Sequence, residues 1–156
     1  MTIARFEHVS AAQYGADAPA DAMPVEAIPL PRRATVGSAG YDFVCPADVT
    51  LSPGDAVTIQ TGIRCEMEPG WVLLIFPRSG LGFKHQLSLA NTVGVIDSDY
   101  FGAANEGHIL VRIVNRGDHA FSIARGERFC QGIFLPHGLA EEEDVQAARQ
   151  GGFGST

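Results

Sequence analysis

The sequence predicts an all-β fold of short antiparallel strands, arranged as a sandwich or a barrel. From Gly40 onward, short apolar runs alternate with turn residues at close spacing, which is the pattern of many short strands. The 156 residues include 18 glycines and 9 prolines, more than a helical protein usually carries. Turns are predicted at Ser52–Asp55 and Glu68–Gly70, because the proline in each presets φ and the glycine accepts a positive φ.

The first elements expected are a strand near Ile3–Val9 and then a loop through the alanine- and proline-rich residues 16–22. One short helix is expected at Ser79–His85, with Ser79 as its N-cap because a hydroxyl there can accept from the first turn. The remaining expected strands are Asp42–Cys45, Ala56–Thr61, Ile63–Glu68, Trp71–Phe76, Leu87–Asn91, Ile109–Asn115, Ala120–Ile123 and Arg128–Leu135.

The end of the chain is expected to differ from the rest. An acidic run at 141–144 is followed by glycine-rich residues with no apolar period, which predicts a mobile tail. We therefore divide the chain into a β domain, residues 1–140, and a flexible C-terminal segment, residues 141–156, that can serve as a lid.

Composition excludes several classes of function. The net charge of −7 argues against nonspecific nucleic-acid binding. No stretch approaches the roughly 20 apolar residues of a membrane span, and no basic start precedes an apolar run, so no secretory signal is expected. Cys45, Cys65 and Cys130 are far apart and lack zinc-site spacing, which predicts reduced thiols and a cytoplasmic protein.

A phosphate-binding turn is expected at Pro77–Gly80, where a strand gives way to the short helix. Helix N-termini present free N–H groups and the positive end of the dipole, which favour phosphate. Arg78 adds a rigid charged fork and Ser79 adds a hydroxyl donor. The plainer interpretation of this turn is an ordinary helix start with a surface arginine.

The segment Asn91–Tyr100 is expected to form two strand-like arms around Gly94. The edge N–H and C=O groups of such a hairpin can contact a planar base, and the Asn91 amide both donates and accepts. Asp97 follows the apolar pair Val95 and Ile96, where partial burial suits a carboxylate that takes a proton from water.

Tyr100 follows three residues later, and its ring is placed to press against a sugar. The alternative for this segment is a surface hairpin whose aspartates and tyrosine cap a turn. That interpretation fits Asp99 better than it fits Asp97 or Tyr100.

Two further polar residues can have either a functional or a purely structural role. Asp42 stands at a strand start, where it can support a site through water or metal or merely form a turn. Gln131 lies inside an apolar strand, so its amide needs either a backbone partner or a ligand oxygen. The five histidines show no metal-ligand spacing and are expected to be structural.

The tail offers an aromatic ring without a core to join. Phe153 stands among glycines, which favours stacking on a ligand ring, and Ser155 and Thr156 can donate to a terminal phosphate. The plainer interpretation is a disordered end with one stray aromatic residue.

Taken together, these segments resemble the five ordered motifs of the trimeric dUTPase family. A single motif is weak evidence, but five in order at suitable spacing are strong. The motifs are Ala39–Phe43, Pro77–Gly80, Asn91–Tyr100, Gly126–Gln131 and Gly151–Thr156.

The resemblance implies a jelly-roll-like β domain that hydrolyses dUTP to dUMP and pyrophosphate with Mg²⁺, held mainly by substrate phosphates without a direct protein ligand. It implies a homotrimer, in which each tail covers a site formed by neighbours because the tail has no obvious docking place on its own domain. The implied roles are the catalytic base (Asp97), deoxyribose selection (Tyr100), uracil contacts (Asn91, Gly94, Val95, Ile96), phosphate contacts (Arg78, Ser79, Gly80, Gln131), support of metal and water (Asp42), and the lid (Phe153, Gly154, Ser155, Thr156).

Two features depart from the family pattern. The tail arginine, Arg149, stands one residue closer to the glycines than usual, so its phosphate contact is open. The turn after Tyr100 carries about five extra residues, Ala103–Gly107, which are expected to lengthen the loop beside the sugar.

Two alternatives to a dUTP hydrolase come from different classes. A dCTP deaminase, alone or as a bifunctional enzyme, carries a glutamate three residues before an asparagine, but here Arg112 precedes Asn115. A noncatalytic trimer would bind nucleotide and signal to a regulatory protein partner, with Ala103–Gly107 and the acidic run as contact surfaces. The presence of Asp97, Tyr100 and the lid favours an enzyme.

Overall fold

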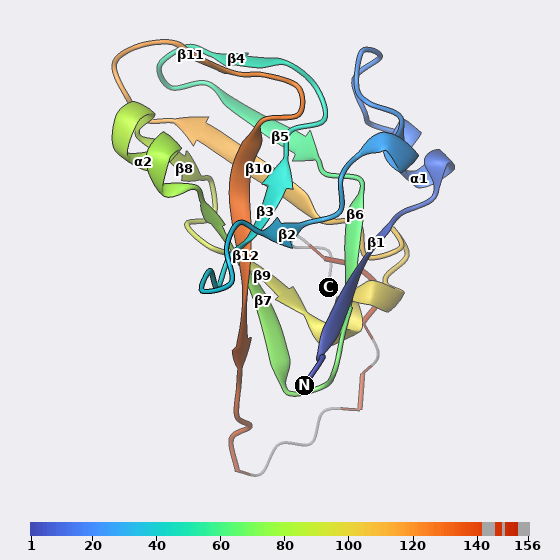
Figure 1. The fold of residues 1–156 in the computed structure, drawn as a ribbon. Helices are drawn as coiled ribbons and strands as arrows, with labels where there is room; N and C mark the ends of the chain where they lie inside the picture. Colours follow the sequence, from blue (N-terminus) through green and yellow to red (C-terminus); the bar gives the residue numbers. More distant parts are fainter. Residues whose placement is uncertain (142–145, 148, 153–156) are drawn as a thin grey trace.

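The computed structural model describes residues 1–141, 146–147 and 149–152, and it is built mainly of short strands (Figure 1). Every strand pairing within that part of the chain is antiparallel, which confirms the predicted fold class. Most of the acidic run and all four lid residues, Phe153 to Thr156, lie outside the described residues. No helix in the described part is long and apolar enough to cross a membrane.

A five-stranded sheet with the order β2-β3-β12-β7-β9 carries Asp42, Gln131 and the segment Gly94–Asp97 among the candidate site residues. Its strands are β2 (Arg32–Arg33), β3 (Tyr41–Val44), β12 (Arg128–Pro136), β7 (Trp71–Pro77) and β9 (Gly94–Asp97). Side chains alternate between two faces of a strand, and the buried members of β7, Leu73 and Ile75, point into the core. The alternate face of this sheet points outward.

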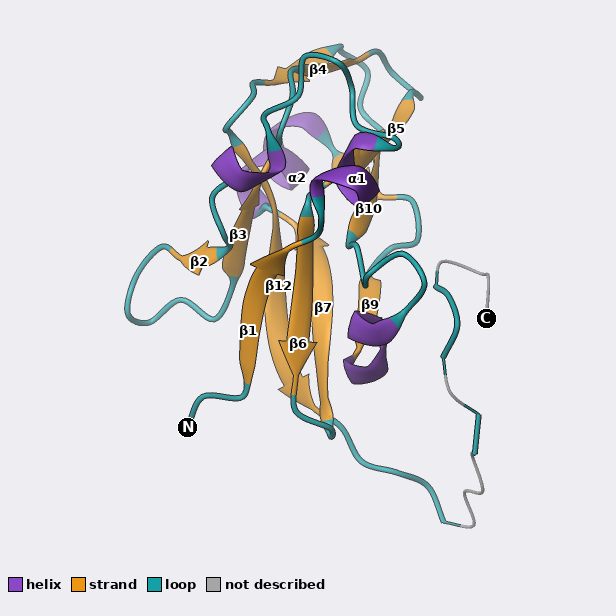
Figure 2. Cartoon of the chain, turned by 90° about the vertical axis from the view of Figure 1, so that its right-hand side faces the viewer, coloured by secondary structure: helices purple, strands orange, loops and turns teal. Residues whose placement is uncertain are grey.

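Three smaller sheets complete the fold. In Figure 2 one of them, the pair β1 and β6, stands in front of β12 and β7. They are β5-β10-β8 (Ala56–Gln60, Leu110–Asn115, Leu87–Leu89), β1-β6 (Ala4–His8, Ile63–Met67) and β11-β4 (Phe121–Ile123, Val49–Leu51).

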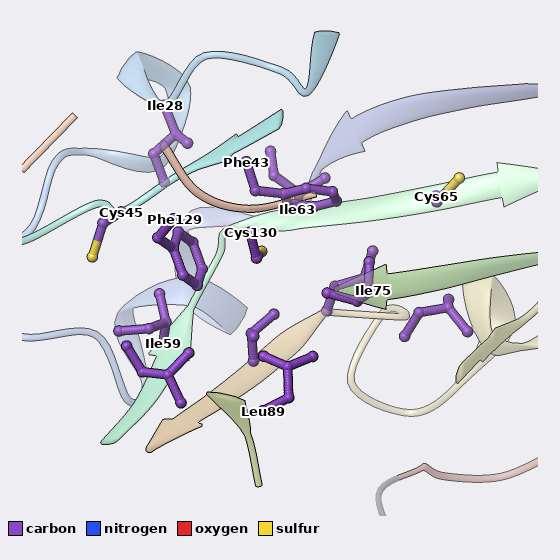
Figure 3. Packing of buried hydrophobic residues seen from close by; sticks show 14 of the residues in the cluster. Ile28, Phe43, Cys45, Ile59, Ile63, Cys65, Ile75, Leu89, Phe129 and Cys130 are labelled. Carbon is purple, nitrogen blue, oxygen red and sulfur yellow. The ribbon is translucent and has the colours of Figure 1, made fainter. Parts of the chain in front are cut away.

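The core lies between these sheets, and Figure 3 shows side chains from several of them gathered there. Phe43 and Phe129 are its largest fully buried members. Packing around Gly132 is close, because a Cβ there would lie 2.8 Å from Leu73 Cδ1 and 3.2 Å from Phe43 Cε2, so a larger residue would displace core side chains. Burial of each large apolar side chain contributes about 1.5–3 kcal/mol to stability.

The helices agree with the sequence in one place and differ in others. Helix α2 spans Ser79–His85 as expected, but Arg78 is its N-cap and makes no side-chain cap bond. The prediction of Ser79 as the N-cap was therefore wrong, because the extended backbone continues through Arg78. Helix α1 (Ala11–Gly15), capped by Ser10, falls where a loop was expected, since five residues are too few to show a helical period.

Two short 3₁₀ helices are also present, η1 (Val25–Ala27) and η2 (Ser98–Gly102). The second follows β9 directly and carries Tyr100. Its position matters for the site, because it sets the direction of the chain immediately after Asp97.

The expected hairpin around Gly94 is not formed. Residues 91–93 make a turn, β9 begins at Gly94, and β9 pairs with β7 in the five-stranded sheet. The preceding strand, β8, pairs instead with β10 in another sheet. The segment therefore crosses between two sheets. Its pairing is determined by strands distant in the sequence and not by the local sequence.

Candidate functional site

The candidate residues fall into two groups at opposite ends of β7. Asp97 is the cross-strand partner of Val72, near the start of β7. Arg78 follows Pro77, which ends the same strand. Six residues of extended chain span roughly 20 Å, so one chain keeps the carboxylate of Asp97 far from the guanidinium of Arg78.

Asp42 is the centre of the first group. Its side chain is only 11% exposed, and its two oxygens accept from Arg78 Nε at 3.2 Å and from Arg128 Nη1 at 3.0 Å. It lies within strand β3 and not in a turn. The sequence interpretation missed Arg128, although its place in the motif Gly126–Gln131 was a signal.

Gln131 is the cross-strand partner of Asp42. Its Nε2 donates to the carbonyl of Pro77 at 3.4 Å, and a side chain at Gly40 would collide with its Oε1. The amide therefore has a backbone partner beside the start of α2. Ser79 and Gly80, in the first turn of that helix, are exposed.

The second group lines a cavity of about 170 Å³. The lining residues are Asn91, Val93, Val95, Asp97, Tyr100, Arg149 and Gly152. Gly94 and Ile96 lie on the face of β9 that is turned toward the core. Ile96 is buried, and a Cβ at Gly94 would lie 3.0 Å from the Cβ of Ile75. These two positions can contribute backbone groups to the cavity but not side chains.

Tyr100 is held firmly from behind. It is buried, its hydroxyl donates to the carbonyl of His108 at 2.7 Å, and it accepts from Asn105 Nδ2 at 2.7 Å. Burial raises the pKa of Tyr100, so it stays a neutral donor near neutral pH. The ring position is thus determined by residues that follow it in the chain.

The extra residues Ala103–Gly107 supply much of this support. Besides Asn105, Glu106 accepts from both the N–H and the hydroxyl of Ser10 at 2.7 Å, which joins the turn to the start of α1. Gly107 has φ +73°, and a Cβ there would lie 2.7 Å from the carbonyl oxygen of Tyr100. The turn therefore lies beside Tyr100 and braces it.

Arg149 brings the described part of the tail to this cavity. Its Nη2 pairs with Asp97, its Nε lies 2.7 Å from Asp99 Oδ1, and its Nη1 donates to the carbonyl of Gly151 at 3.3 Å. Asp99 therefore binds the tail, which corrects the expectation that it merely caps a turn.

The tail also has a backbone contact with the extra residues, because Ala104 N–H donates to the Gln150 carbonyl at 3.1 Å. Figure 2 shows this stretch running beside β9. The expectation that the tail has no docking place on its own domain was wrong for these residues.

His108, behind Tyr100, is a buried structural residue. Its Nε2 accepts from the N–H of Gly62 at 2.9 Å, and desolvation lowers its pKa from 6.5 to about 4. The unfolded chain therefore binds a proton at a higher pH than the folded chain does. The stabilising contribution of neutral His108 is complete above pH 6.5 and is lost as pH falls toward 4.

We expect this histidine to lower the free energy of unfolding by about 2 kcal/mol at pH 5 and about 3 kcal/mol at pH 4. Urea unfolding at these pH values measures the loss, and NMR titration reports whether His108 stays neutral. The exposed-residue control His137→Gln should leave the loss unchanged. Protonation of His108 near pH 6.5 in the folded protein would contradict the assignment.

Within the described residues, no three His, Cys, Asp or Glu side chains gather closely enough to hold a metal ion. Hard oxygen donors suited to Mg²⁺ are present on Asp42 and on Asp97, whose neighbour Asp99 binds the same arginine. Asp42 is bracketed by two arginines, and Asp97, whose side chain is 48% exposed, pairs with Arg149 alone.

Comparison with known proteins covers more than four fifths of the chain. A family model described as dUTPase matches residues 26–156. A deoxyuridine 5'-triphosphate nucleotidohydrolase of Hahella chejuensis is 44% identical over 137 residues, 83% of this chain and 87% of its own length. The enzyme of that name from Pseudomonas syringae pv. tomato is 46% identical over 134 residues, 81% of this chain and 85% of its own.

Solved structures agree. A dUTPase from Streptococcus mutans superposes with a TM-score of 0.70 at 36% identity, covering 87% of this chain and 98% of its own. A mutant dUTPase from phage phi11 of S. aureus, described as coordinating a structural Mg(II) ion, reaches a TM-score of 0.67 at 19% identity, covering 94% and 98%. The phage protein shares the fold.

Proposed function

Since this chain belongs to the dUTPase family and hydrolyses dUTP to dUMP and pyrophosphate, we propose that Asp97 is the base that activates the attacking water. The observation that carries this is its place: a half-exposed carboxylate lines a cavity with Asn91 and Tyr100. Asp97 takes a proton from water, whose oxygen attacks the α-phosphorus. The bond from that phosphorus to the bridging oxygen breaks, and pyrophosphate leaves.

The first group supplies the phosphate contacts in this proposal. Arg78, Ser79 and Gly80 meet the phosphates at the start of α2, and Gln131 adds an amide donor. Asp42 orients Arg78 through their ion pair. When bound, Mg²⁺ neutralises phosphate charge and aligns the leaving pyrophosphate, and it is held mainly by the phosphates because these residues offer single carboxylates.

The second group binds the nucleoside. Asn91 and the backbone of Gly94–Ile96 contact uracil, and the ring of Tyr100 packs against deoxyribose. In this proposal the tail covers the substrate. Phe153 stacks over the base, and Gly154, Ser155 and Thr156 reach toward the γ-phosphate. The three free, buried cysteines support the proposal of a reducing, cytoplasmic location.

We propose further that the protein is a homotrimer whose sites are shared between chains. The roughly 20 Å between Asp97 and Arg78 along β7 is too long for both to act on one triphosphate. The outer face between them is apolar, and Val95 and Leu135 on it are 58% and 44% exposed. A second copy that covers this face would bring its own Arg78 to Asp97.

Mixing two inactive variants tests the shared site. Asp97→Asn and Arg78→Gln chains are each expected to be nearly inactive alone. After co-refolding in equal amounts, about a quarter of the sites should combine an intact Asp97 with an intact Arg78 from a neighbour. Mass from light scattering gives the oligomeric state, and absence of recovered activity in mixed trimers would rule out sharing.

A pyrophosphate-release assay with dUTP, UTP, dTTP and dCTP tests the substrate assignment. Tyr100→Ala should narrow the preference for dUTP over UTP by roughly tenfold or more, because the ring no longer blocks a 2′-hydroxyl. It should also lose about 3–5 kcal/mol of stability, since the ring is buried. Tyr100→Phe, which keeps the ring, should retain the preference.

If UTP is still excluded by the folded Tyr100→Ala variant, selection lies elsewhere. Ammonia release from dCTP would favour the deaminase alternative. The structure offers that alternative no support at Arg112, which is exposed on β10 and donates to Thr58 Oγ1 at 3.2 Å.

A further inference from the structure

A second cavity, of about 530 Å³, lies beside Asp42 and carries an excess of positive charge. Its charged lining is Arg32, Arg33, Arg128 and Asp42, a net charge of +2 in a chain of −7. The other lining residues are Pro29, Leu30, Ala34, Val44 and Gly126. A local positive charge of this kind attracts anions although the whole protein repels them.

The strand register puts Arg32 on the same face of the five-stranded sheet as Asp42 and Gln131. Arg32 is the cross-strand partner of Asp42, and Asp42 is the partner of Gln131. Directly opposed residues on neighbouring strands share a face of the sheet. Arg32 therefore extends the row of polar residues on the outer face by one strand, to the edge at β2.

Among the described residues, Arg32 differs from the other arginines because its guanidinium has no hydrogen-bond or ion-pair partner. Arg33 donates to the carbonyls of Val36 and Ser38, and Arg128 pairs with Asp42. The backbone of Arg32 pairs with β3, but in the part of the chain that the structure describes its side chain makes no hydrogen bond or ion pair, and Asp42 is already neutralised from two sides. The guanidinium of Arg32 is therefore available to an external anion.

We propose that this cavity binds a polyphosphate anion, with Arg32 as the residue that contacts it directly. The shared chemistry is that of pyrophosphate, which can arrive as the phosphate chain of dUTP or as the free product. Guanidinium groups suit phosphate oxygens because two parallel N–H donors match them. Only this choice of anion rests on the proposed function.

The test is calorimetric titration of the full-length protein with sodium pyrophosphate and with dUMP, in metal-free buffer at low salt. Arg32→Gln should weaken pyrophosphate binding by roughly three- to tenfold and leave dUMP binding unchanged. The matched control is Arg116→Gln, which removes the same charge from an exposed arginine bonded to Ser88. Unchanged pyrophosphate binding in Arg32→Gln, or equal weakening in the control, overturns the proposal.

Steady-state kinetics separate the two sources of the anion. An equal rise in the KM for dUTP and in the inhibition constant of pyrophosphate places the substrate's own phosphates in the cavity. A rise in the inhibition constant alone assigns the cavity to free product. Asp97→Asn should bind pyrophosphate as the wild type does. The proposal for Arg32 can therefore fail while Asp97 remains the base, and the assignment of Asp97 can fail while Arg32 still binds pyrophosphate.

Discussion

Replacing Asp97 by asparagine should lower kcat by a factor of about 10²–10⁴, the usual cost of removing a general base. The amide has nearly the same shape as the carboxylate, and the side chain is 48% exposed, so folding and dUTP binding should persist. Pyrophosphate release measures turnover, and calorimetry with a nonhydrolysable dUTP analogue measures binding.

The structure supplies a matched control for this experiment. Asp99 also pairs with Arg149 but does not line the cavity of about 170 Å³ that Asp97 lines. Asp99→Asn should therefore weaken the tail contact and leave most of the turnover. If the two variants are equally impaired, loss of tail docking explains both, and the base must be another group.

Deleting the residues after Gln150 should reduce kcat/KM by about 10²-fold, as misplacement of a substrate commonly does. The deleted residues include the proposed lid; ordering a segment costs roughly 1–2 kcal/mol per residue, which bound nucleotide would have to offset. In the proposed lid mechanism, closure would exclude water and hold the triphosphate for attack. The melting temperature should stay almost constant, because Arg149 keeps its contacts with Asp97 and Asp99.

Arg149→Ala distinguishes two explanations of that loss. If this variant is as impaired as the deletion, the arginine contributes to closure despite its shifted position. If it is nearly normal while the deletion is inactive, Phe153 and the terminal hydroxyls carry the closure. Full activity of the deleted chain would show that the lid model does not apply to this protein.

Local sequence was sufficient wherever neighbours along the chain decide the structure. Alternating apolar residues and Pro-Gly turns predicted most strands to within two residues, and α2 has the predicted bounds. Two predictions were nevertheless wrong for reasons within the local sequence. Ser79 was displaced from the N-cap by one residue, and α1 was too short to show a period.

Partners distant in the sequence had to be seen in the structure. The bracket around Asp42 joins residues from β3, β12 and the start of α2, and the Gly94 segment pairs with β7 instead of folding on itself. The ion pairs between Arg149 and the two aspartates cross about fifty residues of chain.

The sequence by itself thus determined the strand-rich fold and the residue types available for phosphate, base and sugar. Periodicity, turn chemistry and ordered motifs are properties of short segments, so they can be read without partners. Which residues meet was decided by the tertiary structure alone, because strand pairing and ion pairs depend on the free energy of contacts between segments that the sequence keeps apart.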